Sequence, residues 1–380
     1  MKKFRVLPLF IAGVISAAAL TGCAEGEEKG KMRDISTMEL VRDMGIGINL
    51  GNTFESCGSW IDSSAVQNYE TGWGSPVITK EMIKGYADEG FGVLRIPVAW
   101  SNMMAEDYTI NPDYLKRVRE VVDMAIGNNM YVIMNIHWDG GWWEKFPTEK
   151  EECMKKYTRI WEQLSEEFKS CSDYLMFESL NEEGCWNDVW NRWNGDAGKD
   201  EAFGLLNEIN QKFVDIVRSS GGNNKKRHLL IAGYATDVEL TCDDAFDMPE
   251  DDAGRCAVSV HYYTPSTFCI LEEDADWGKA QAYWGSPTDR AELEKYMNML
   301  EETFISNDIP VIIGEYGVAT GNKTDEVVRD YISSVCDEAY SRQICPVLWD
   351  VTDAHYSRTE CKMKDQQLLE MMMAVKDAEE

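Results

Sequence analysis

The stretch YLMFESLNEEG, residues 174–184, decides the fold class of this chain. Residues 174–180 are apolar over about the length of one strand, which predicts a strand buried on both faces. The run ends abruptly in Asn181, Glu182, Glu183 and Gly184. An amide beside an acid at the end of a buried strand indicates a place where burial and neighbouring charges tune a pKa. The alternative is an ordinary polar strand end that turns into solvent, which would have the same sequence pattern.

A second stretch of the same kind lies further along the chain. Residues 309–318 read IPVIIGEYGV, a β-branched apolar run that leads to Glu315 with a glycine on either side. Two carboxyl groups at strand ends are what glycosidic bond hydrolysis requires, one as acid and base and the other as nucleophile or base. The alternative is two unrelated surface acids. The repetition of an apolar run with a terminal glutamate favours the paired interpretation.

Short apolar runs alternate with longer amphipathic segments from residue 34 onward, which is the pattern of repeated βα units. We predict strands at residues 45–52, 92–100, 131–138, 174–180, 228–233, 257–263, 309–318 and 346–351. Helices are expected at residues 79–89, 111–128, 149–169, 201–220 and 289–306. This order predicts an α/β protein, a single (β/α)8 TIM barrel over residues 34–380, with its active site at the C-terminal ends of the strands.

Polar and aromatic side chains gather at those strand ends. They are Arg95 in the second strand, His137 and Trp138 at the third, Asn181 and Glu182 at the fourth, His261 and Tyr263 at the sixth, Glu315 at the seventh and Trp349 at the eighth. Asn49, Asn52 and Glu55 at the first strand are weaker candidates for more distant contacts. Structural alternatives exist: a turn-capping amide for Asn181, a buried hydrogen bond for either histidine and a core ion pair for Arg95.

The N-terminus differs from the rest of the chain. Lys2, Lys3 and Arg5 precede an apolar segment at residues 6–20 that is too short to span a membrane, which indicates a secretory signal. Residues 20–23, LTGC, resemble a bacterial lipobox, which implies a lipoprotein signal peptide at residues 1–22 and lipidation of Cys23. Residues 23–33 are expected to form a flexible tether. We therefore expect an exported protein, lipid-anchored to the bacterial cell envelope or cell surface; an ordinary signal peptide with a chance cysteine is the alternative.

Composition limits the possible partners. The net charge of −30 argues against nucleic acid, because a phosphate-binding face needs a basic stripe, and it fits an uncharged partner. Of eleven cysteines, ten remain besides Cys23, either as disulfides or as buried thiols. With four histidines and no cluster of zinc-binding spacing, we expect no catalytic metal and no cofactor. A monomer is expected.

Several strings of the sequence carry a family resemblance: GINLGNTFE, VLRIPVAW, VIMNIHWDGGW, LMFESLNE, SVHYYTPSTF, PVIIGEYG and LWD. Together they resemble glycoside hydrolase family 5, the cellulase-type family of retaining (β/α)8 enzymes, over residues 34–350. Within the family, the sequence most resembles subfamily 4, whose members act on β-1,4-glucans, mixed-linkage glucans and xyloglucan. The resemblance implies that Glu182 is the general acid and base and Glu315 the nucleophile. It also implies a sugar subsite of Arg95, His137, Asn181, His261, Tyr263 and Trp349, to which we add Asn52 as a substrate-binding candidate.

The chain departs from that family in three places. Glu183 stands where many members have proline, Trp138 stands where many have a second histidine, and residues 351–358 read VTDAHYSR where an Asn-Gly type of turn is often found. These departures leave open the shape of the leaving-group side, and therefore the preferred glucan.

A retaining mechanism places the two carboxyl groups about 5 to 5.5 Å apart, so ionising one makes ionising the other harder. We expect Glu315 to be charged and Glu182 protonated in the resting enzyme, with Arg95 and the Tyr263 hydroxyl on Glu315. Trp349 is expected to stack under a sugar ring, and Trp161 to lie in the core. The remaining candidates, which either line the cleft or pack inside, are Trp142, Trp143, Trp186, Trp190, Trp193, Trp277 and Trp284.

The resulting hypothesis is a retaining, endo-acting hydrolase that cleaves β-1,4-glucosidic bonds in cellulose-type, mixed-linkage β-glucan or xyloglucan polysaccharides by double displacement. One alternative is a β-mannanase or xylanase of the same fold. Another is a non-catalytic surface lipoprotein that only captures glycans, because a fold does not determine a function.

Overall fold

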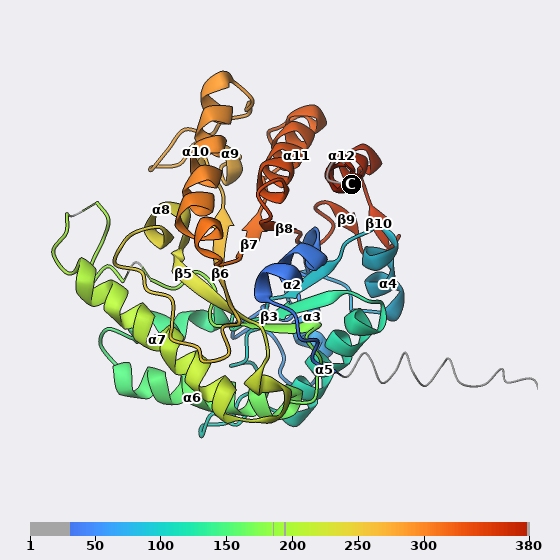
Figure 1. Ribbon diagram of the computed structural model, residues 1–380. Helices are drawn as coiled ribbons and strands as arrows, with labels where there is room; N and C mark the ends of the chain where they lie inside the picture. The colour runs from blue at the N-terminus through green and yellow to red at the C-terminus, as the bar shows by residue number, and fades with distance from the viewer. Residues whose placement is uncertain (1–30, 185, 194, 378–380) are drawn as a thin grey trace, which may run out of the picture.

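Eight parallel strands form a closed barrel in the computed structural model, which describes residues 31–184, 186–193 and 195–377 (Figure 1). Each strand pairs with the next one along the chain, and β8 pairs with β1 to close the sheet. The strands are β1 (Gly47–Asn49), β2 (Val93–Ile96), β3 (Tyr131–Met134), β4 (Leu175–Glu178), β5 (Leu229–Asp237), β6 (Cys256–Tyr262), β7 (Val311–Tyr316) and β8 (Cys345–Leu348). The predicted (β/α)8 barrel is confirmed.

Most strands are shorter than the apolar runs that predicted them. The first run covered residues 45–52, whereas β1 is Gly47–Asn49. The apolar runs continue past the residues that pair in the sheet because the turns after the strands are also buried, as at Leu50 and Phe54. In contrast, β5 continues beyond its predicted end at residue 233 and contains a register shift between Ala232 and Asp237.

Helices surround the barrel (Figure 1). α4 (Lys80–Asp88), α5 (Pro112–Gly127), α6 (Lys150–Phe168), α7 (Lys199–Ser219) and α10 (Pro287–Thr303) match the predicted helices. Side-chain oxygens of Thr79, Asn111 and Ser286 cap the first turns of α4, α5 and α10. The prediction missed α2 (Thr37–Met44), α11 (Asp325–Tyr340) and α12 (Gln366–Asp377). Shorter elements are α3 (Gln67–Glu70), η1 (Asp139–Lys145), η2 (Gly222–Lys225), α8 (Val238–Thr241), α9 (Ser266–Cys269), η3 (Ile305–Asn307), β9 (Tyr356–Ser357) and β10 (Lys362–Met363).

The barrel interior is layered because successive strand residues point alternately inward and outward. Near the N-terminal ends of the strands, Val93 and Met176 belong to an apolar layer. Leu40, Val41 and Met44 of α2 pack against this layer. Two residues further along β2 and β4, the next inward positions hold Arg95 and Glu178. The interior therefore changes from apolar to charged toward the C-terminal ends of the strands.

A second apolar core lies between the barrel wall and the helices. The outward residue Phe177 of β4 packs against Trp161 of α6, with ring centroids 5.4 Å apart, and both are fully buried. Burying an apolar side chain of this size contributes on the order of 2 kcal/mol or more. The predicted core position of Trp161 is confirmed.

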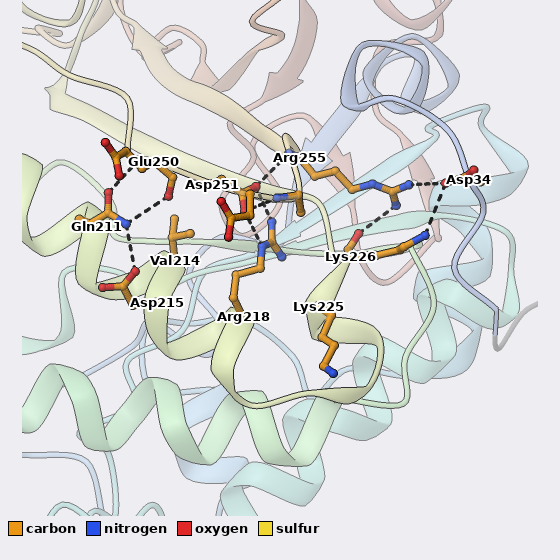
Figure 2. Close-up of a pocket in the computed structure, with 12 residues that line it drawn as sticks. Asp34, Gln211, Val214, Asp215, Arg218, Lys225, Lys226, Glu250, Asp251 and Arg255 are labelled. Carbon is orange, nitrogen blue, oxygen red and sulfur yellow. Dashed lines mark hydrogen bonds and ion pairs between the residues drawn. The ribbon is translucent and has the colours of Figure 1, made fainter.

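The chain enters the barrel at the N-terminal ends of the strands. Arg33 pairs with Asp173, just before β4, and Arg255, just before β6, donates a hydrogen bond to Asp34. Figure 2 shows this region, where a cavity of about 750 Å³ is bordered by charged side chains that pair with one another. Arg33 and Asp34 are therefore held on the face opposite the strand ends that carry the candidate site.

The described cysteines are free thiols: Cys57, Cys153, Cys171, Cys242, Cys256, Cys269, Cys336, Cys345 and Cys361. Of the two states left open by the sequence, these residues adopt the thiol. Burial raises the pKa of the Cys269 thiol to about 12, which makes its reactive thiolate scarce at neutral pH.

The predicted signal peptide at residues 1–22, Cys23 and most of the tether at residues 23–33 lie outside the described residues, as does Cys185. Across residues 31–184, 186–193 and 195–377, no helix combines the length and apolar character needed to cross a membrane.

Candidate active site

Glu182 and Glu315 meet at the C-terminal end of the barrel. One carboxylate oxygen of each, together with a ring nitrogen of His261, lies within 4.8 Å of the other two atoms. Glu182 follows β4, His261 lies in β6 and Glu315 lies in β7. Retaining glycosidases need a carboxyl separation of about 5 to 5.5 Å, whereas inverting enzymes need roughly 6.5 to 9.5 Å. The two acids are therefore as close as a double displacement requires.

A β-bulge in β7 places Glu315 beside His261. Val260 of β6 pairs with Ile313, but the next residue, His261, pairs with Glu315, so Gly314 is an extra residue in β7. Bulges of this kind re-aim side chains next to active sites. A Cβ at Gly314 would lie 3.1 Å from Ser259 Oγ and 3.2 Å from His261 Nε2, so glycine lets β7 approach these two side chains closely.

Arg95 is fully buried and holds Glu315 from below. Its Nη1 donates to Glu315 Oε1 at 2.7 Å and to Asn49 Oδ1 at 3.0 Å, and its Nη2 donates to Asn181 Oδ1 at 2.9 Å. Its Nε donates to Glu178 Oε2 at 2.8 Å. Burial lowers the pKa of Arg95, but Glu178 and Glu315 outweigh it, so the net direction is upward and the charge is kept. Arg95 thus points at Glu315 and is also a member of a core ion pair.

Glu315 is held on both oxygens and is almost completely buried. The Tyr263 hydroxyl donates to Glu315 Oε2 at 2.9 Å, opposite the bond from Arg95 to Oε1. Burial raises the pKa of Glu315; His261 and Arg95 oppose this effect and Glu182 adds to it, and the net direction is upward. The protein matrix therefore favours a proton on Glu315 more than it would on an exposed glutamate.

Glu182 has a different environment, because its side chain is 48% exposed and His261 Nδ1 lies 2.8 Å from its Oε1. Partial burial alone would raise the pKa of Glu182, but the hydrogen bond and charge of His261, and then Arg95, lower it below its ordinary value. The directions of these two pKa shifts oppose the expectation that Glu182 holds the proton and Glu315 the charge in the resting protein. The sequence did not show that His261 contacts Glu182 at hydrogen-bond distance, nor how deeply Glu315 is buried.

Among the described residues, Glu182, His261 and Glu315 form the one group of possible metal ligands whose donor atoms lie close enough together to hold a metal ion. His261 Nδ1 is already hydrogen-bonded to Glu182 Oε1 at 2.8 Å and lies 3.6 Å from Glu315 Oε2. This arrangement suits a shared proton better than a metal.

An open cavity of about 580 Å³ lies over the two acids. Trp349 and His137 form one part of its wall, with parallel rings whose centroids lie 5.8 Å apart. Burial, followed by Arg95 and His261, lowers the pKa of His137 well below its ordinary value, so its ring is neutral and offers one donor and one acceptor. The other lining residues are Glu182, Tyr263, Cys269, Ile270, Glu272, Glu315, Val318, Ala319, Thr320, Val351, Ala354 and His355.

Of the predicted site residues, His137, Glu182, Tyr263, Glu315 and Trp349 line this cavity. Arg95 contacts Glu315, His261 contacts Glu182, and Asn181 accepts a hydrogen bond from Arg95. Asn52 does not line it; its backbone N–H donates to the Glu55 carboxylate. Asn49 and Glu55 are buried and make internal hydrogen bonds, so they are not sugar contacts. The Asn49 side-chain amide donates hydrogen bonds to backbone carbonyl groups of β7 and β8, which explains how this polar side chain can be buried.

Sequence reasoning missed Glu178. This fully buried carboxylate accepts from Arg95 on one oxygen and from Ser259 Oγ, at 2.7 Å, on the other. A glutamate inside an otherwise apolar strand was visible in LMFESLNE, and its two-residue spacing from Met176 indicated an inward position.

Two departures from the family pattern have a physical explanation. Glu183, in place of proline, is fully buried; it accepts a hydrogen bond from the Asn181 N–H, and burial raises the pKa of its carboxyl well above the ordinary value. Its side chain therefore holds the turn that carries Glu182. In the segment after β8, Asp350 Oδ1 accepts from the backbone N–H groups of His355 and Tyr356, at 2.8 and 3.1 Å.

The tryptophans divide between packing and exposure. Trp186, Trp190 and Trp284 are buried, so they are packing residues. Trp138, Trp193 and Trp277 are 45%, 82% and 58% exposed, so they remain free to meet a ligand. Trp142 and Trp143 are intermediate and lie in η1.

Known proteins of similar sequence are named as endoglucanases. The chain is 37% identical to endoglucanase A of Ruminococcus albus over 324 residues, which covers 84% of this chain and 85% of that protein. It is 34% identical over 348 residues to the xyloglucan-specific endo-beta-1,4-glucanase BoGH5A of Bacteroides ovatus, which covers 86% of this chain and 68% of that one.

The barrel also superimposes on a solved GH5-4 broad specificity endoglucanase from Ruminococcus champanellensis with bound cellotriose, with a TM-score of 0.80 and 31% identity. That match covers 90% of this chain and 99% of the other. A family model described as cellulase (glycosyl hydrolase family 5) matches residues 55–355. The chain therefore belongs to glycoside hydrolase family 5, the cellulase family.

Proposed function

We propose that this protein is a retaining endo-β-1,4-glucanase in which Glu315 is the nucleophile and Glu182 the general acid and base. The observation that carries the proposal is the grouping of both carboxylates and His261 within 4.8 Å, with Glu315 anchored by Arg95 and Tyr263. In the first step Glu315 attacks the anomeric carbon while Glu182 protonates the departing oxygen. In the second step Glu182 takes a proton from water, the water oxygen bonds to the anomeric carbon, and Glu315 leaves as a carboxylate.

Substrate binding supplies the protonation state that this reaction needs. The productive form carries a proton on Glu182 and a charge on Glu315, which is the reverse of the tendency in the free site. A sugar in the cavity covers the exposed half of Glu182, and this loss of hydration raises its pKa. Glu315 is already buried, so its pKa changes less, and substrate binding therefore favours a proton on Glu182 over one on Glu315.

The remaining residues fit subsite roles. Trp349 offers a flat apolar face at the cavity wall, which suits the C–H face of a pyranose. Asn181 Oδ1 accepts a hydrogen bond from Arg95, which leaves its amide N–H groups for the sugar 2-hydroxyl, a contact that strengthens in the transition state. The neutral ring of His137 can bind a hydroxyl group. Asn52 is left as a candidate for a more distant contact, because it lies outside the cavity wall.

The proposed substrate class is a neutral β-1,4-glucan. Relatives named as an endoglucanase and as a xyloglucan-specific endoglucanase, and a structural neighbour with bound cellotriose, support this class. Hydrolysis of barley β-glucan, xyloglucan, carboxymethylcellulose, mannan and xylan, with analysis of product lengths, tests it. Preferred cleavage of mannan or xylan would establish the alternative specificity, and binding without release of reducing ends would establish a glycan-capturing protein.

Azide rescue tests the two roles separately. Glu182→Ala and Glu315→Ala should each lose several orders of magnitude in turnover, because each removes half of a coupled mechanism. Azide should restore Glu182→Ala with a β-glycosyl azide product and Glu315→Ala with an α-glycosyl azide product. Glu370→Gln, an exposed change on α12, is the matched control. Near-wild-type turnover in either alanine variant would contradict the proposal.

We also propose export and lipid anchoring through Cys23. Arg33 and Asp34 are held on the face opposite the cavity, so a tether ending there would turn the cavity away from a membrane. Radiolabelled fatty acid should enter the wild-type protein and not Cys23→Ala when each is expressed in a bacterium with lipoprotein-processing enzymes. Release of the variant into the soluble fraction should accompany the loss of label, and equal labelling of both would contradict the anchor.

A further inference from the structure

Glu178 is the buried acid that the proposed mechanism does not use. It lies in β4, is fully buried and does not line the cavity over Glu182 and Glu315. Its two oxygens have separate partners: Arg95 Nε at 2.8 Å and Ser259 Oγ at 2.7 Å. Ser259 lies in β6, so this carboxylate joins three strands of the barrel through Arg95 of β2.

Arg95 connects Glu178 to the proposed nucleophile. Its Nε pairs with Glu178 and its Nη1 pairs with Glu315 at 2.7 Å, so two carboxylates share one buried cation. Asn49 and Asn181 accept the other two hydrogen bonds from this guanidinium, and both are neutral. The orientation of Arg95 is therefore set by Glu178 on the side away from the substrate.

Charged and titratable side chains reach Glu315 from several elements of the barrel. Arg95 approaches it from β2, His261 from β6, Tyr263 from the residue after β6, and Glu182 from the segment after β4. An opposite charge favours ionisation of a carboxyl group, and a like charge opposes it. Arg95 would stabilise the Glu315 carboxylate more strongly if Glu178 did not carry a second negative charge on the same guanidinium.

We propose that Glu178 is a positioning residue for the hydrolysis: it fixes the Arg95 guanidinium under Glu315, and its charge weakens the hold of Arg95 on the nucleophile. A carboxylate bound less tightly ionises at higher pH and keeps more of its basicity for attack. This inference rests on the proposed function, because it takes Glu315 as the nucleophile.

The test is the pH dependence of nucleophile trapping by a 2-deoxy-2-fluoro-β-cellobioside whose dinitrophenolate leaving group needs no protonation. The trapping rate reports the ionisation of Glu315 without a contribution from Glu182. In Glu178→Gln the midpoint of the trapping rate against pH should move to lower pH by about half a unit or more, because Arg95 then pairs with Glu315 as its only carboxylate. The limiting rate should fall at least about threefold, because the more tightly bound carboxylate is less basic.

Two further variants separate charge from structure. Ser259→Ala removes one hydrogen bond to Glu178 and no charge, so the midpoint should stay in place. Glu178→Asp keeps the charge on a shorter side chain, so it should keep the wild-type midpoint with a slower limiting rate; it also serves as the test if Glu178→Gln does not fold. A folded Glu178→Gln with an unmoved or raised midpoint, or a lowered midpoint in Glu178→Asp, would overturn the inference.

The failure of the proposed function would look different. Peptide mapping of the trapped wild-type protein should find the fluoroglycosyl group on Glu315. A wild-type protein that is not trapped, or is trapped elsewhere, would refute the assignment of the nucleophile, whereas trapping at Glu315 with no effect of Glu178→Gln would refute only the role of Glu178.

Discussion

His261 is hydrogen-bonded to Glu182, with Nδ1 at 2.8 Å from the carboxylate oxygen Oε1, and its other ring nitrogen is buried with no partner among the described residues. The same Nδ1 lies 3.6 Å from Glu315 Oε2. One imidazole thus acts on both proposed catalytic acids and lowers the pKa of each relative to what burial alone would produce.

Replacing His261 with alanine should move both limbs of the kcat/KM profile to higher pH. Without the ring, the pKa of Glu182 rises, so the acid keeps its proton to higher pH and the basic limb moves up. The pKa of Glu315 rises too, so the acidic limb follows in the same direction. The profile on a soluble β-glucan measures both shifts. His228→Gln, on the opposite face of the barrel, is the control, and unmoved limbs in His261→Ala would contradict the assignment.

The Tyr263→Phe variant should lose about 10- to 100-fold in kcat with little change in KM. The phenylalanine removes one hydrogen bond to a buried carboxylate, which contributes about 1.5 to 3 kcal/mol when the acceptor is charged. Steady-state kinetics on cello-oligosaccharides gives both constants. Tyr262→Phe is the matched control, because the neighbouring Tyr262 belongs to the outer core. Equal losses in the two variants would indicate a general packing effect.

Trp349→Ala should raise KM for soluble glucans about tenfold, because a stacking residue binds the sugar ring in both the ground state and the transition state. Trp349→Phe should lose less, since it retains an aromatic face. The parallel contact with His137, at 5.8 Å, makes a smaller loss in kcat expected as well. An unchanged KM in the alanine variant would remove Trp349 from the proposed subsite.

His228 should make the protein less stable in acid. It is fully buried beside Thr37, and burial, followed by Arg255, Arg218 and Arg33, lowers its pKa to about 3. The unfolded chain has the ordinary value of about 6.5, so the unfolded state takes up the proton first. This contribution to stability is complete above about pH 6.5 and is lost progressively as the pH falls toward about 3.

At pH 5 the expected loss from His228 is about 2 kcal/mol, from a gap of roughly 1.5 units at about 1.4 kcal/mol each. His228→Gln should therefore lose less stability than the wild type between pH 7 and pH 5, as measured by denaturant unfolding. Glu55 and Asp350 have pKa values raised to about 7 and 6, so they act in the opposite direction in both proteins and cancel in the comparison. Parallel stability curves would contradict this role of His228.

The barrel could be predicted because its strands are buried on both faces. Most strands lie in largely apolar runs, and the runs at residues 174–180 and 309–318 lead directly to Glu182 and Glu315, so the positions of these two acids could be predicted from local sequence. The helices α2, α11 and α12 were missed although α2 carries a capping box at Ser36 and Glu39. α2 packs against the interior apolar layer, a role that becomes visible only when the barrel around it is known.

The chemistry of the site was less predictable than its residues. Glu178 was not recognised because a buried charge makes sense only beside its partner, and Arg95 is 83 residues away in the chain. Asn49 and Asn52 looked alike as polar residues near the first strand, yet Asn49 binds backbone carbonyls inside the barrel and Asn52 stays at the rim. Hydrogen-bond partners of this kind are contacts across the sheet, which local sequence does not specify.

The amino-acid sequence alone determined that an eightfold βα repeat would place two glutamates at the same end of a barrel, because strand periodicity and strand order are properties of the chain. Only the tertiary structure decided in which direction the pKa of each glutamate is shifted. A pKa depends on burial and on nearby charges, and these come from Arg95, His261 and the Gly314 bulge, which reach the site from different strands.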